Sequence, residues 1–128
     1  MELLDEARDR LDFHLSVQDA FWFALVVSND ARTRAALRRH AGEAVSIEVR
    51  TLDESVPDLL ATLLDPTADH LLWIVADGPP DVWEPAVGAL LLALNERREA
   101  LRARPHGVIF EGREKLKSVL RNLAPDLF

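Results

Sequence analysis

The chain has 128 residues, the length of one ordinary globular domain and too short for two. Apolar residues make up 48% and charged residues 29%, a balance that excludes a disordered chain. There are no cysteines, which excludes a disulfide scaffold, a thiolate zinc site and a cysteine nucleophile. The formal net charge of −7 argues against nucleic acid and against an anionic membrane as partners. We therefore expect a single cytoplasmic domain over residues 1–128.

The N-terminal residues have the pattern of an amphipathic helix. Apolar residues recur at helical spacing over residues 2–16, which predicts a helix within an N-terminal segment 1–18. Acidic residues such as Glu2 and Asp5 argue against a signal peptide, and no apolar run approaches the length of a bilayer span. We expect this helix to be added to a core over residues 20–128.

From residue 20 onward, strand patterns alternate with helix patterns. Strands are predicted at residues 21–27, 45–51, 70–76 and 108–110. Helices are predicted after them, at residues 31–41, 55–65, 84–103 and 113–123. This alternation indicates right-handed crossovers and a mainly parallel sheet with helices on both faces. The predicted fold class is α/β, a three-layer αβα sandwich of the Rossmann or flavodoxin type.

The strands differ in hydropathy pattern, and this difference predicts their order in the sheet. Strands 21–27 and 70–76 are continuously apolar, as expected of central strands that are buried on both faces. Strand 45–51 alternates apolar and polar residues, as expected of an edge strand with one solvated face. These patterns predict the order 2-1-3-4 for the four strands.

The predicted order places a ligand crevice between the first and third strands. In an open parallel sheet, a ligand binds beyond the carboxyl ends of the strands, where the strand order reverses. The turns there contain Asp30 and Asp77, and neither turn carries a glycine-rich phosphate loop with its lysine. A nucleotide-binding P-loop is therefore excluded. Asp30, or its neighbour Asn29, is interpreted as the N-cap of the following helix.

Asp30 and Asp77 are the remaining candidates for a metal site, because paired carboxylates hold Mg²⁺ in a phosphoacceptor receiver domain. That site also needs a hydroxyl and a lysine on later strands, and Glu111 stands where the hydroxyl belongs. The histidines lack metal-ligand spacing, and no nucleophilic serine motif is present. We therefore predict no enzymatic activity and no cofactor. Two alternatives stay open: a degenerate receiver-like signalling domain, and a small-ligand binder that uses the crevice between the first and third strands.

Candidates for partner binding come from exposed charges and one tryptophan. Glu48 and Arg50 lie on the polar side of the predicted edge strand, whose open backbone can accept a strand of another chain. Arg34 and Arg38 belong to an arginine-rich helix, interpreted as a solvated face that a protein partner can contact. Trp83 lies in the predicted loop before the long helix, where an indole packs in the core or anchors a partner.

One stretch of the long helix is more specific. The sequence Leu-Asn-Glu-Arg-Arg-Glu-Ala-Leu at residues 94–101, with Ala-Pro-Asp-Leu at 124–127 and strand Phe23–Val27, resembles a family of bacterial domains. These are degenerate, P-loop-lacking relatives of the STAND NTPases in conflict and immunity systems, and the resemblance covers residues 20–128. It implies an inactive NTPase-like domain that serves as an adaptor or sensor for a protease, a TPR module or an effector. Relatives continue into a further strand where this sequence stops.

The motif also has a structural interpretation. Arg98 shares a helical stripe with the apolar Leu94 and Leu101, which predicts a half-buried arginine beside the core. A half-buried guanidinium needs an acceptor, and Asp126 is the candidate. Asn95 belongs to the same structural motif. The other arginines near this helix end are interpreted as a solvated face: Arg97, Arg102 and Arg104.

Overall fold

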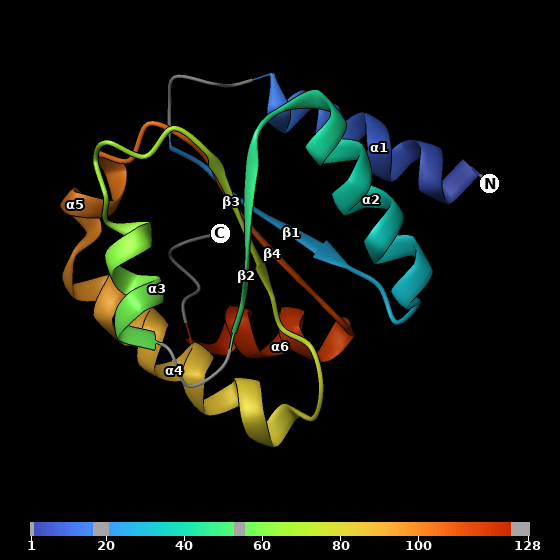
Figure 1. Ribbon diagram of the computed structural model, residues 1–128. Coiled ribbons are helices and arrows are strands. Elements are labelled where there is room, and N and C mark those ends of the chain that lie inside the picture. Colours follow the sequence, from blue (N-terminus) through green and yellow to red (C-terminus); the bar gives the residue numbers. More distant parts are fainter. Residues whose placement is uncertain (1, 17–20, 53–55, 124–128) are drawn as a thin grey trace.

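The computed structural model describes residues 2–16, 21–52 and 56–123. Its elements in chain order are α1 (Glu2–Leu15), β1 (Phe23–Val27), α2 (Ala31–Ala44), β2 (Ile47–Thr51), α3 (Val56–Leu63), β3 (Leu71–Val75), α4 (Pro80–Glu96), α5 (Arg98–Arg102), β4 (Val108–Gly112) and α6 (Glu114–Leu123). The four strands form one parallel sheet in the order β1-β4-β3-β2 (Figure 1). The α/β fold with a parallel sheet is confirmed, whereas the predicted strand order 2-1-3-4 is wrong.

The error in the order concerns β1, which is an edge strand despite its continuously apolar sequence. Among the described strands it pairs with β4 alone, with Phe23 beside Val108. The central strands are β3 and β4, whose residues are buried throughout. Helices α2 and α6 pack on β1, so helices cover its apolar residues on both faces of the sheet, while no other described strand pairs with its outer edge. A strand with apolar residues on both faces is covered by helices on both sides. This pattern does not indicate whether one or two other strands pair with it.

Two helical layers cover the sheet, with α1 and α2 on one face and α3 to α6 on the other (Figure 1). Under α1 and α2, Leu37 packs with the fully buried Trp73 of β3. Under the other layer, Leu90 of α4 packs with Phe110 of β4 in the larger core cluster. Within the described residues, no helix is both long and apolar enough to cross a bilayer.

β2 lies at the second edge of the sheet, as its alternating pattern predicts. Among the described strands it pairs only with β3, and Val49 in its centre is 47% exposed. Figure 1 looks onto this edge, with β2 in front of the other strands. Ile47 packs with the cluster under α1 and α2, so Glu48 and Arg50 face the α3 side.

The helix predicted at 84–103 is two helices with an earlier start. A proline at the first helical position is compatible with helix initiation, and α4 begins at Pro80. Arg97 then has φ −126° and ψ 38°, which interrupts the helical backbone before α5. Trp83 consequently lies within α4 and outside any loop. In the same way, α2 extends past its predicted end to Ala44.

Candidate functional site

The observed strand order places the switch point of the sheet between β1 and β4. The helix after β1, α2, covers one face of the sheet, and the helix after β4, α6, covers the other. A ligand crevice forms where successive connections leave neighbouring strands on opposite faces. The crevice predicted between the first and third strands is wrong, because β4 lies between β1 and β3.

The backbone that follows β1 is hydrogen-bonded within the chain. The Ser28 amide donates to the Gly112 carbonyl at 3.1 Å, and the Asp30 amide donates to Ser28 Oγ at 3.1 Å. The Asp30 carboxylate accepts the Arg32 amide at 3.0 Å and the Thr33 hydroxyl at 3.1 Å, which confirms Asp30 as the N-cap of α2. The helix terminus that would attract an anion therefore carries a carboxylate of its own chain.

Asn29 supports the neighbouring helix. Its side-chain oxygen accepts the amide of Glu114, the first residue of α6, at 3.1 Å. The turn between β4 and α6 is tight, because a Cβ at Gly112 would lie 2.6 Å from the Leu116 side chain. The loops that follow β1 and β4 thus fasten each other across the switch point.

We expect Asp30→Ala to lower the urea midpoint of unfolding near neutral pH. The hydrogen bonds from the Arg32 amide and the Thr33 hydroxyl hold the pKa of Asp30 below its ordinary value of 3.8. Because the folded-state pKa is the lower one, this stabilisation is present above the unfolded-state pKa and is lost as pH falls through the folded-state pKa. Midpoints of the variant and the wild type should therefore converge as the pH falls below 3.8, the ordinary pKa of this carboxyl group. Equal midpoints at neutral pH would contradict the capping role.

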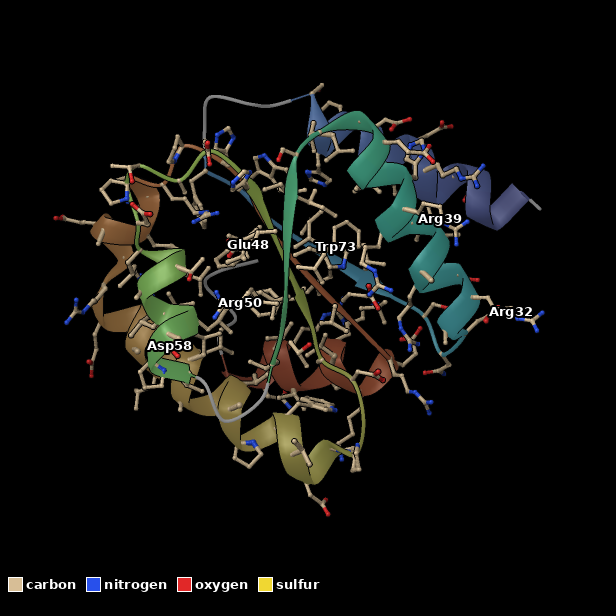
Figure 2. All side chains as sticks on the ribbon, viewed as in Figure 1. Arg32, Arg39, Glu48, Arg50, Asp58 and Trp73 are labelled. Carbon is tan, nitrogen blue, oxygen red and sulfur yellow. The ribbon has the colours of Figure 1, made fainter. Side chains whose placement is uncertain are left out.

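A buried ion cluster centred on Glu111 lies beside this loop. Glu111 is 3% exposed, and its Oε2 accepts Arg34 Nε at 3.3 Å. Its Oε1 accepts Arg38 Nη1 at 3.0 Å and Trp73 Nε1 at 2.9 Å. Arg34 Nη1 also donates to the Ser28 carbonyl at 2.6 Å. The cluster joins β4, β3, α2 and the carboxyl end of β1, and Figure 2 shows Trp73 on the α2 side of the sheet.

Arg34 is therefore not part of the solvated face that was predicted for α2, and Arg38, whose side chain is 32% exposed, is only partly solvated. Arg34 is 6% exposed, whereas Arg32 and Arg39 point outward from the helix (Figure 2). The prediction failed because the last predicted strand stopped before Glu111, so the two cations had no visible buried partner. Their spacing of four residues was the available signal, since it puts both on the helix face that also carries the buried Leu37.

Asp30 and Asp77 do not form a metal site. They follow β1 and β3, which β4 separates, and both residues are exposed. The Asp77 carboxylate accepts the amide of Gly78 at 2.8 Å. Across the part of the chain that the structure describes, no group of three or more His, Asp or Glu side chains could hold a metal ion.

Two further predicted positions are corrected by burial. Trp83 is 3% exposed and belongs to the larger core cluster, so the surface anchor is wrong and the core interpretation holds. Arg98 is exposed and donates to the Asn95 side-chain oxygen from Nε at 3.0 Å and Nη2 at 2.7 Å. The break at Arg97 ends the helical stripe on which its half-burial was predicted. Asp126, its predicted partner, lies outside the described residues.

A second buried arginine, Arg104, contradicts the predicted solvated face near residues 97–104. It is 2% exposed, and its Nη1 and Nη2 donate to the carbonyls of Thr62 at 2.7 Å and His70 at 2.9 Å. Burial lowers the pKa of Arg104, and the charges of Glu48 and Asp65 oppose this shift. Arg104 thereby fastens the end of α3 to the start of β3.

Comparison of the chain with protein-family models, with curated proteins and with solved structures finds no significant match. Two features of the described residues bear on function: the switch point is filled by the chain's own side chains, and the edge at β2 carries both charge and apolar surface.

Proposed function

We propose that this domain is a non-enzymatic protein-interaction module, an adaptor or sensor, of a bacterial defence or signalling system. The observation that carries the proposal is the filled switch point between β1 and β4. The Asp30 carboxylate caps the helix terminus that an anionic ligand would need, and Arg34 donates to the Ser28 carbonyl beside it. A helix N-terminus binds anions through its free amides. At this terminus a nucleotide phosphate would meet the Asp30 carboxylate instead.

The open edge of β2 supports the interaction part of the proposal. Edge strands present amide and carbonyl groups that a strand from another chain can pair with. Glu48 and Arg50 beside this edge have side chains that are 40% and 33% exposed, so both charges can select a partner. The resemblance at residues 94–101 suggests the class of partner: a protease, a TPR module or an effector of the same system.

We expect ATP and GTP, each with Mg²⁺, to give no binding heat in calorimetry and no shift in the melting temperature of the chain. A ligand at about 100 times its Kd would stabilise the chain by about 2.7 kcal/mol, which is easily measured. Cyclic nucleotides in the same screen test the small-ligand alternative. Asp30→Asn is the matched control for the charge of the cap. The variant loses the carboxylate charge and keeps a side-chain oxygen that can accept the hydrogen bonds of the cap. Micromolar binding of a nucleotide by the wild type would contradict the proposal.

A further inference from the structure

The backbone groups of β2 divide into a set that faces β3 and a set that faces outward. The Leu71 amide donates to the Ser46 carbonyl at 3.0 Å, and the Leu52 amide donates to the Val75 carbonyl at 2.8 Å. Because alternate residues of a strand direct their amides and carbonyls to opposite sides, the even-numbered residues of this segment face β3. The residues whose backbone groups face the open edge are Ile47, Val49 and Thr51.

The side chains in the centre of this edge have a distinctive order. Glu48 and Arg50 project toward α3 (Figure 2), and both are partly exposed. Arg50 Nη1 lies 3.6 Å from Glu48 Oε2, which is too long for a hydrogen bond, and donates instead to Thr62 Oγ1 at 3.2 Å. Val49 between them projects to the other face and is 47% exposed. An acid, an apolar residue and a base thus follow one another along the edge.

We propose that this edge pairs with the same edge of a second copy of the chain, antiparallel and centred on Val49. In this register each Val49 faces the other as a hydrogen-bonded pair. Glu48 then lies opposite Arg50 of the second copy, and Arg50 lies opposite Glu48 of the second copy. A two-fold axis passes through the Val49 pair, so one surface contacts itself and the two sheets become continuous. The proposal rests on the proposed interaction function and adds a second copy of the chain as a partner at this edge.

The order of charges selects both the partner and the direction of pairing. A parallel arrangement in the same register would set Glu48 against Glu48 and Arg50 against Arg50, and like charges directly opposite repel. Many edge strands prevent pairing with another copy by carrying charges that would lie opposite like charges. An acid and a base placed one residue on either side of Val49 have the opposite effect, because the two-fold axis exchanges them. The pairing also covers the exposed Val49 side chain.

Sedimentation velocity of the full chain tests the proposal directly. We expect the mass of the wild type to rise from one chain toward two between about 5 and 500 µM at low salt, since a single strand pair is a small interface. Arg50→Glu sets two acids against each other, and Glu48→Arg sets two bases against each other. Each variant should weaken self-association by at least about tenfold. Glu99→Arg on α5 is the matched control for the charge change and should associate like the wild type.

Mixing the two charge variants gives the sharper test. Glu48→Arg chains and Arg50→Glu chains present opposite charges to each other at both positions, so their mixture should form heterodimers. The double variant Glu48→Arg/Arg50→Glu should restore self-association, because it again has one acid and one base around Val49. Val49→Pro removes an amide from the open edge and spares the β2–β3 ladder. It should be folded by circular dichroism and monomeric by sedimentation.

Three outcomes would overturn the self-pairing. The first is a wild-type chain that stays monomeric up to about 500 µM, a result that leaves the nucleotide titration to test the proposed function separately. The second is a dimer that every β2 variant retains, which would place the contact elsewhere, with the open edge of β1 as the next location. The third is a mixture of the two charge variants that forms no heterodimer, which would remove the proposed register.

Discussion

Replacing Glu111 with alanine is expected to lower the free energy of unfolding by about 3–5 kcal/mol, because it leaves the buried charge of Arg34 without its carboxylate partner. Arg34 is 6% exposed and would keep its charge with the Ser28 carbonyl as its remaining acceptor. The indole N–H of Trp73, which is fully buried, would also lose its acceptor. Removing one member of a buried network costs more than the network contributes, since the groups left behind stay desolvated. Urea unfolding followed by circular dichroism measures the loss.

Two further variants separate charge from position in this cluster. Glu111→Gln keeps the shape and one acceptor oxygen, so its loss should be smaller than that of Glu111→Ala. Glu43→Ala removes an exposed carboxylate from α2 and should change stability by no more than about 0.5 kcal/mol. A Glu111→Ala chain that unfolds at the same urea concentration as Glu43→Ala would show that the cluster contributes nothing to stability.

The second large effect is expected at Arg104, whose replacement by alanine should cost about 2–4 kcal/mol. Its guanidinium supplies two donors to the carbonyls of Thr62 and His70, and both carbonyls would be left without this partner. The loss of a buried side chain of this size would also leave a cavity. Thermal and urea unfolding of the full chain measure the effect.

Arg102 provides the matched control, since it is an exposed arginine two positions away on α5. Arg102→Ala should stay within about 0.5 kcal/mol of the wild type. Arg104→Lys should lose most of the stability that Arg104→Ala loses, because a single ammonium cannot reproduce the planar fork that reaches two carbonyls. Indistinguishable midpoints for the Arg102 and Arg104 alanine variants would contradict this role.

Local patterns in the sequence predicted most of the elements and the parallel sheet. The position of β1 in the sheet could not be predicted in this way. The continuous apolar run at 70–76 is the central strand β3, and the alternation at 45–51 is the edge strand β2. At 21–27 a similar apolar run predicted the wrong strand position, because α2 and α6 cover the faces of β1 while no other described strand pairs with its outer edge. Whether the two faces of a strand are buried can be predicted from its own residues. Which strands pair with it depends on segments that are distant in the sequence.

The same distinction holds at the candidate site. The Asp30 cap was predictable, because its hydrogen-bond partners lie two and three residues away. The cluster around Glu111 was not, because Arg34 and Glu111 are 77 residues apart and meet only when α2 packs against β4. Arg98 was misplaced for a local reason of another kind: Arg97 leaves the helical region of the backbone, and nothing in the apolar spacing marks that break.

The placement of β1 has a consequence for the order in which the protein can assemble during synthesis. β2 pairs with β3, and β3 pairs with β4, so these three strands can form a sheet in the order in which they are synthesised. β1 emerges first but must wait for β4, as the contact between Asn29 and Glu114, 85 residues apart, illustrates. Closing so long a loop is slow, and an unpaired apolar strand is exposed meanwhile. Phe23–Val27 therefore stays without its partner strand in the sheet until β4 has been synthesised.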